Sequence, residues 1–208
     1  MFEGTAGGLI LVVVSLAAPR NDPLSSGCDR AGCRLREWCP AYLAARSGTP
    51  GIGVEVDSEA ARACRRIGHT VVVGGAESLP FRSNSFPGVL CKVVIPYTDE
   101  HLAIAEIGRI LAPGGVALLY LHGLGYSLRY LLRPEMWKRS VYAAKTILNT
   151  AAYRLAGRRL PGLLGDTLFQ SERRPRRYYL SAGLRLEATI PTRRFVGRPV
   201  FIGYVVRK

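Results

Sequence analysis

Four short apolar runs, separated by polar or helix-like stretches, occupy one tract of this chain of 208 residues. The runs span 51–56, 70–73, 89–95 and 116–121. Strands that alternate with helices at this spacing form a parallel sheet, and ligands of such sheets bind at the carboxyl ends of the strands. The tract therefore predicts an α/β fold with a doubly wound, mostly parallel sheet and a nucleotide-like ligand held by the loops that follow the strands.

Helices are expected around this tract from their start signals, stop signals and apolar periodicity. A first helix is predicted over 35–46, because Gly48 and Pro50 would end it. A second is predicted over 58–67, with Ser58 or Asp57 as its N-cap. A third is predicted over 99–111, where five apolar residues fall on one face: Ala103, Ile104, Ile107, Ile110 and Leu111.

The C-terminal half has a different character. Residues 135–157 predict an amphipathic, basic helix, and its apolar stripe consists of Trp137, Val141, Ala144, Leu148, Ala152 and Leu155. A further helix is predicted over 172–182, closed by Gly183. Two alternating segments, 184–190 and 199–206, predict an antiparallel hairpin. Residues 1–208 are therefore expected to form a single domain in which 124–182 is a basic helical elaboration.

The net charge of +14 lies entirely in the last part of the chain. Residues 1–128 hold 11 basic and 11 acidic residues, whereas residues 129–208 hold 18 basic and four acidic residues. Such asymmetry favours an anionic partner for residues 129–208, such as a membrane surface, nucleic acid or a phosphorylated substrate. The alternative is a solvated basic surface without a partner.

The five cysteines give no sign of disulfides or of a metal site. They are Cys28, Cys33, Cys39, Cys64 and Cys91. Their number is odd and none forms a C-x-x-C pair, so reduced thiols in a cytoplasmic protein are expected and no metal is. The apolar residues 9–18 lack the preceding basic residues of a secretion signal, which favours a buried first strand there.

Four sequence elements in order resemble one family. They read G-V-E-V-D, G-G-A-E-S-L-P-F, S-F-P-G-V and L-A-P-G-G between residues 51 and 123. Together they resemble the class I S-adenosylmethionine-dependent methyltransferases, in particular the small type 11 group. The resemblance implies a Rossmann-like sheet that ends with one antiparallel strand, S-adenosylmethionine as the cofactor, and methyl transfer to a small-molecule or lipid-like acceptor.

The resemblance also implies which residues contact the cofactor. Glu55, at the end of its strand, would accept hydrogen bonds from both ribose hydroxyls. The loop that follows the next strand would contact the adenine through Gly75, Ala76 or Glu77. Further contacts are expected at four positions beside these loops: Gly32, Gly53, Val56 and Lys92.

Three departures from the family pattern bear on activity. Two glycines of the first cofactor motif are replaced by Arg34 and Arg36, and residues 1–50 are divergent as a whole. Gly75 and Pro87 stand where the family has aspartates. A non-catalytic binding protein that uses its basic C-terminal surface is therefore an alternative, and an RNA methyltransferase is another.

Methyl transfer needs few side chains, because the sulfonium donor is already activated and the enzyme mainly aligns the reactants. A general base is needed only when the acceptor carries a proton on oxygen or nitrogen. The candidates follow the fourth and fifth strands of the family order: Tyr97, Asp99 and His122. Asp99 has an alternative role as the N-cap of the helix that it precedes.

Overall fold

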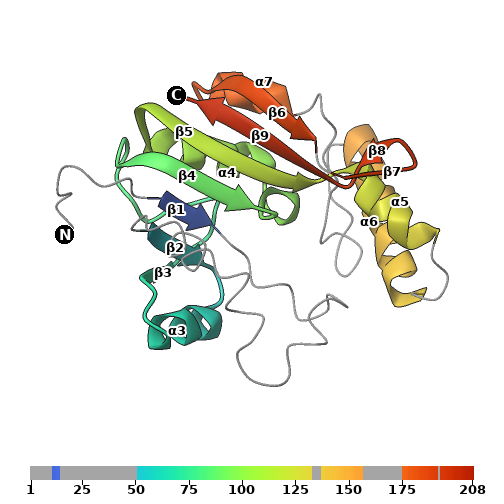
Figure 1. Ribbon diagram of the computed structural model, residues 1–208, viewed down its shortest axis with the longest axis horizontal. Helices are drawn as coiled ribbons and strands as arrows, with labels where there is room; N and C mark the ends of the chain where they lie inside the picture. Colours follow the sequence, from blue (N-terminus) through green and yellow to red (C-terminus); the bar gives the residue numbers. More distant parts are fainter. Residues whose placement is uncertain (1–10, 15–50, 133–136, 157–174, 192) are drawn as a thin grey trace.

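The computed structural model describes residues 11–14, 51–132, 137–156, 175–191 and 193–208 (Figure 1). Seven strands form one sheet in the order β3-β2-β1-β4-β5-β9-β6. Their bounds are β1 Leu11–Val14, β2 Gly51–Glu55, β3 Val71–Val73, β4 Phe86–Lys92, β5 Leu111–His122, β6 Arg185–Pro191 and β9 Phe201–Arg207. The pairs among β1 to β5 are parallel, and β9 is antiparallel to both neighbours, β5 and β6. The predicted Rossmann-like sheet with a C-terminal antiparallel hairpin is confirmed.

Two helices begin at aspartate caps. The Asp57 side chain accepts hydrogen bonds from two backbone N–H groups at the start of α3 (Ser58–Arg66), so Asp57, not Ser58, is the N-cap. Asp99 does the same for α4 (Glu100–Ile110), where it binds the N–H groups of His101 and Leu102. A carboxylate at this position also interacts favourably with the positive end of the helix.

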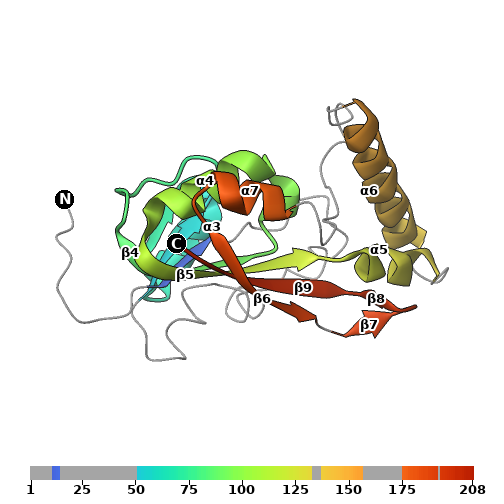
Figure 2. The same cartoon turned by 90° about the horizontal axis from the view of Figure 1, so that it is seen from above.

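The core lies between the sheet and the pair α4 and α7 (Pro175–Ser181), which pack against each other and cover one face (Figure 2). Burial alternates along the central strands β4 and β5. Val89, Cys91, Ala117 and Leu119 belong to this core, whereas Leu90, Leu118 and Tyr120 are half-buried. The largest fully buried side chains of the described residues include Tyr179, Tyr204, Ile104, Ile107 and Leu119. Cys64 and Cys91 are buried, and burial raises the pKa of the Cys91 thiol to about 12.

Several element bounds differ from the sequence prediction. The strand predicted over 89–95 begins at Phe86 and ends at Lys92, because Val93 adopts a φ of 59° and leaves the extended conformation. Residues Ile95–Tyr97 then form a 3₁₀ turn, η2. β5 begins at Leu111 rather than Val116, since Leu111 already pairs with Phe86. The helix predicted over 35–46 lies outside the described residues.

A helical pair follows β5. α5 (Leu124–Leu131) was not predicted, and α6 (Trp137–Ala156) corresponds to the basic helix expected over 135–157. The two helices contact each other at the side of the sheet toward which β4 and β5 point (Figure 1). A small hairpin of β7 (Arg194–Phe195) and β8 (Arg198–Pro199) contacts α5. Among the helices that the structure describes, none is both long and apolar enough to span a bilayer.

Candidate functional site

The sheet has a topological switch point at β1. β1 pairs with β2 on one side and with β4 on the other, so that Val14 is in register with Val54 and Cys91. The strand order therefore reverses between these neighbours, and the loops that leave β2 and β4 diverge from there. In open α/β sheets, ligands bind at this point, beyond the carboxyl ends of the strands. Glu55 and Lys92 are the last residues of the two flanking strands.

Glu55 is held at the end of β2 and does not extend into bulk water. Its side chain is 8% exposed, and its Oε1 accepts a hydrogen bond from the Asp57 N–H at 3.1 Å. Asp57 is itself the cap of α3, so the loop that turns after β2 orients the carboxylate. A buried, oriented carboxylate at a strand end has the acceptor chemistry that a ribose diol requires.

The residues around Glu55 have clear local environments. A Cβ built on Gly53 would lie 3.2 Å from a methyl group of Val71, so this glycine allows β2 and β3 to pack closely. Val56, the next residue after the strand, is 53% exposed. Gly53 therefore has a packing role of its own, whereas Val56 lies on the surface beside the carboxylate.

The loop after β3 contains the predicted adenine contacts. A Cβ built on Gly75 would meet no atom within 4 Å, so open space lies beside this residue. Ala76 is buried in the core, so the open part of this loop lies at Gly75. The Glu77 carboxylate accepts a hydrogen bond from the Asp99 N–H, which ties this loop to the start of α4.

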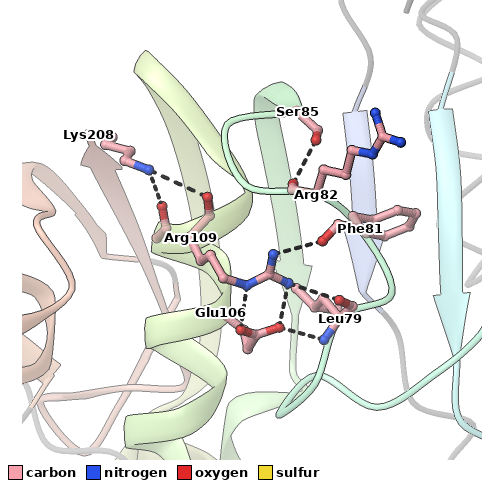
Figure 3. Close-up of polar contacts among 8 residues, drawn as sticks. Leu79, Phe81, Arg82, Ser85, Glu106, Arg109 and Lys208 are labelled. Atoms are coloured by element: carbon pink, nitrogen blue, oxygen red, sulfur yellow. Dashed lines mark hydrogen bonds and ion pairs between the residues drawn. The ribbon is translucent and has the colours of Figure 1, made fainter. Parts of the chain in front are cut away.

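A clamp of Glu106 and Arg109, both on α4, fixes the same loop further along (Figure 3). Arg109 Nε binds Glu106 Oε1 at 2.6 Å, and the two arginine Nη atoms donate to the carbonyls of Leu79 and Phe81 at 2.9 and 2.7 Å. The Lys208 ammonium donates to the carbonyls of Gly108 and Leu111, near the C-terminus of α4. The arginine contacts fix the loop at Leu79 and Phe81, and the lysine contacts tie the C-terminus of the chain to the end of α4.

Two candidates follow β4. Lys92 is half-buried at the strand end, and burial lowers the pKa of its ammonium group. Tyr97 is half-buried on η2 and immediately precedes the segment that starts α4. Asp99 is exposed, and its Oδ1 accepts the two N–H groups of the helix start at 3.0 and 3.2 Å. The N-cap role foreseen for Asp99 is therefore confirmed.

His122, at the end of β5, lies within an aromatic cluster. Its ring stacks on Tyr126 with centroids 4.0 Å apart and planes 9° apart, and Phe201 lies 5.3 Å away. The imidazole is 8% exposed, and burial lowers its pKa to about 3. A group with this pKa is neutral at physiological pH and is a weak base.

Glu55, Lys92 and His122 end their strands, and the other described candidates follow strand ends, except Gly53, which lies inside β2. Gly32 lies outside the described residues. The Glu106–Arg109 clamp was missed, although an acid and an arginine three residues apart on a predicted helix give a signal for such a pair. No group of three metal-ligating side chains occurs within the described part of the chain. The fold is Rossmann-like, and a buried carboxylate ends one of its parallel strands.

Comparison with known proteins finds a methyltransferase domain in part of the chain. Residues 31–119, a little under half of the chain, match the family model described as a methyltransferase domain. The match places a methyltransferase domain over these residues, and the fold is the one seen in solved S-adenosylmethionine-dependent methyltransferases. No curated protein matches the chain.

Many solved structures share the fold. A methyltransferase from Mesorhizobium loti has a TM-score of 0.61 at 14% identity, with 97% of this chain and 92% of that chain covered. One from Methanosarcina mazei has a TM-score of 0.57 at 14% identity, with 96% and 92% covered. A geranyl diphosphate methyltransferase has a TM-score of 0.58 at 16% identity, with 98% and 72% covered. At these identities the likeness shows the fold.

Proposed function

We propose that the protein transfers a methyl group from S-adenosylmethionine to a small-molecule or lipid-like acceptor, with Glu55 binding the ribose of the donor. The observation that carries this proposal is the carboxylate of Glu55, buried and oriented at the switch point of the sheet. When bound, the sulfonium donor supplies an activated methyl group, so the protein mainly has to position it.

The adenine contact falls to the backbone of the loop after β3. Glu77 already accepts the Asp99 N–H, and its role is to hold the loop in place. Open space beside Gly75 leaves room for a planar ring near the backbone of Gly75 and Ala76. Lys92, half-buried at the end of β4 on the other side of the switch point, offers an ammonium group to the ligand.

Among the three candidates for a general base, Tyr97 fits best. Asp99 uses a carboxylate oxygen to cap α4, and His122 is buried in the aromatic cluster, where its lowered pKa makes it a weak base. Tyr97 lies half-buried after β4, near the switch point. An acceptor without an acidic proton would need no base, and Tyr97 would then orient it.

The lipid-like acceptor has support in the class of proteins that share the fold. The geranyl diphosphate methyltransferase was solved in complex with GPP and sinefungin, so this architecture accommodates an isoprenoid acceptor. A cytoplasmic location remains a prediction from the cysteine pattern. A non-catalytic binding protein is the competing function, and donor binding separates the two.

Isothermal titration of the full chain with S-adenosylhomocysteine tests the proposal. We expect measurable binding by the natural sequence and a loss of about tenfold or more in Glu55→Gln, since a charged acceptor for two hydroxyls is removed. Glu59→Gln, an exposed acid on α3, is the matched control and should bind normally. Absence of binding at millimolar ligand, or equal binding by both variants, would contradict the proposal.

A further inference from the structure

Three residues of the apolar stripe of α6 face solvent. Val141, Leu148 and Leu155 are 51, 63 and 90% exposed, and they are spaced seven residues apart. Residues at this spacing lie on the same side of a helix, and the three span about 20 Å along its axis. The most apolar face of α6 is therefore its outer face.

The inner face of α6 is largely polar. Thr146, Asn149 and Thr150 are buried, together with Ala143, and Thr150 Oγ1 donates to the Thr146 carbonyl at 2.6 Å. An ordinary surface helix shows the reverse arrangement, with its apolar side toward the core. Within the described part of the chain, Val141, Leu148 and Leu155 thus stay outside the core and are available for a partner.

The charge of α6 limits what that partner can be. Its 20 residues include four basic side chains and no acid: Lys138, Arg139, Lys145 and Arg154 are the basic residues. Two copies of α6 packed along the stripe would bring like charges together. A nucleic acid would neutralise the charge but would leave Leu148 and Leu155 in water. An anionic lipid surface accepts both the apolar side chains and the basic ones.

We propose that α6 is an interfacial helix that docks the protein on an anionic membrane surface, with Val141, Leu148 and Leu155 inserted at the boundary of headgroups and acyl chains. α6 lies on the side of the molecule toward which the parallel strands β4 and β5 point (Figures 1 and 2). Docking would thus bring the bilayer to the same side as the strand-end loops. The inference does not rest on the proposed function, because lipid docking requires no cofactor.

Co-sedimentation of the full chain with vesicles tests this inference. Vesicles that mix phosphatidylcholine and phosphatidylglycerol should bind the protein, and vesicles of phosphatidylcholine alone should bind it far less. A triple variant, Val141→Gln with Leu148→Gln and Leu155→Gln, should lose about tenfold or more in affinity for the anionic vesicles, because three apolar side chains no longer insert. These residues are exposed, so circular dichroism should show an intact fold.

The matched control is Leu180→Gln on α7, a residue that is 76% exposed but lies away from α6 (Figure 1). It should bind vesicles as the natural sequence does. A second pair of variants tests the role of charge. Lys145→Glu on α6 should weaken binding to anionic vesicles, whereas Arg66→Glu on α3, which makes the same change in charge, should not.

Three outcomes would overturn the inference. One is equal vesicle binding by the triple variant and the natural sequence, because charge alone would then explain it. Another is no binding to anionic vesicles at low salt. The third is that the natural sequence binds no vesicles but forms a dimer in sedimentation, and that the triple variant abolishes this dimer.

Discussion

The carboxylate of Glu106 accepts the backbone N–H of Leu79 at 2.7 Å, although the two residues are 27 positions apart in the sequence. Arg109 completes this link, because it binds the same carboxylate and the carbonyl of Leu79. Both polar groups of one loop residue are thus fixed by one helix. The loop that contains Gly75 is therefore held in position by α4 rather than by β3, the short strand that precedes it.

Glu106→Gln should loosen this loop. We expect the free energy of unfolding to fall by about 1 to 2 kcal/mol, because charge-assisted hydrogen bonds become neutral ones. Chemical denaturation measures the loss, and binding of S-adenosylhomocysteine should weaken in parallel. Glu59→Gln serves as a control for the removal of one acid. A variant with unchanged stability and unchanged affinity would show that the clamp does not position the loop.

The pH dependence of stability gives a second readout of Glu106. The hydrogen bond from Arg109 lowers the pKa of Glu106 below its ordinary value of 4.5. The stabilisation is therefore fully present above pH 4.5 and is lost as the pH falls through the lower, folded-state pKa. Glu106→Gln should remove this part of the acid sensitivity. An acid-denaturation curve parallel to that of the natural sequence would contradict the assignment.

His122 should give stability a pH dependence at higher pH. Burial lowers its pKa from 6.5 to about 3, so an unfolded chain takes up a proton below pH 6.5 that the folded chain does not. Folding is therefore expected to become less favourable as the pH falls below 6.5, with a slope of about one proton. His122→Phe keeps an aromatic ring in the stack and should remove that slope in thermal unfolding. His101→Asn, at an exposed position, should retain it.

Gly125 should tolerate no side chain. A Cβ at this position would lie 2.3 Å from the carbonyl oxygen of Arg198, so α5 would have to move away from β8. We expect Gly125→Ala to cost about 2 kcal/mol or more, in the range of overpacked sites. Gly75→Ala makes the same chemical change where no atom lies within 4 Å, and it should have little effect. Similar melting temperatures for the two variants would contradict this account.

Much of the fold follows from local sequence signals. Apolar runs predicted the parallel strands, and Asp99 could be foreseen as a cap because a carboxylate before an apolar-periodic segment satisfies free N–H groups. Glu55 could be placed at a strand end for a different reason, because the apolar run before it ends abruptly. α5 was missed because Gly125 lowers its helix propensity, and its packing against β8 is a contact that local patterns do not encode.

The parts of the site that depend on distant contacts could not be predicted. Glu77 was expected to be either an adenine ligand or a solvated acid, whereas it binds the Asp99 N–H 22 positions away. His122 was expected at the cleft because it ends a strand, but Tyr126 and Phe201 bury its ring. The exposed stripe of α6 had a clear periodicity, yet periodicity alone does not show which face of a helix packs inward.

Gly75→Asp should strengthen cofactor binding. The family has an aspartate at this position for the exocyclic amine of adenine, and the open space beside Gly75 accommodates a side chain. Its φ is also outside the left-handed region, so an aspartate brings no backbone strain. One added hydrogen bond of about 1 to 1.5 kcal/mol corresponds to a gain of about tenfold in affinity. Titration with S-adenosylhomocysteine measures it, and Gly75→Ala controls for the added Cβ alone. If the aspartate variant binds no more tightly than the alanine variant, the adenine does not lie beside this loop.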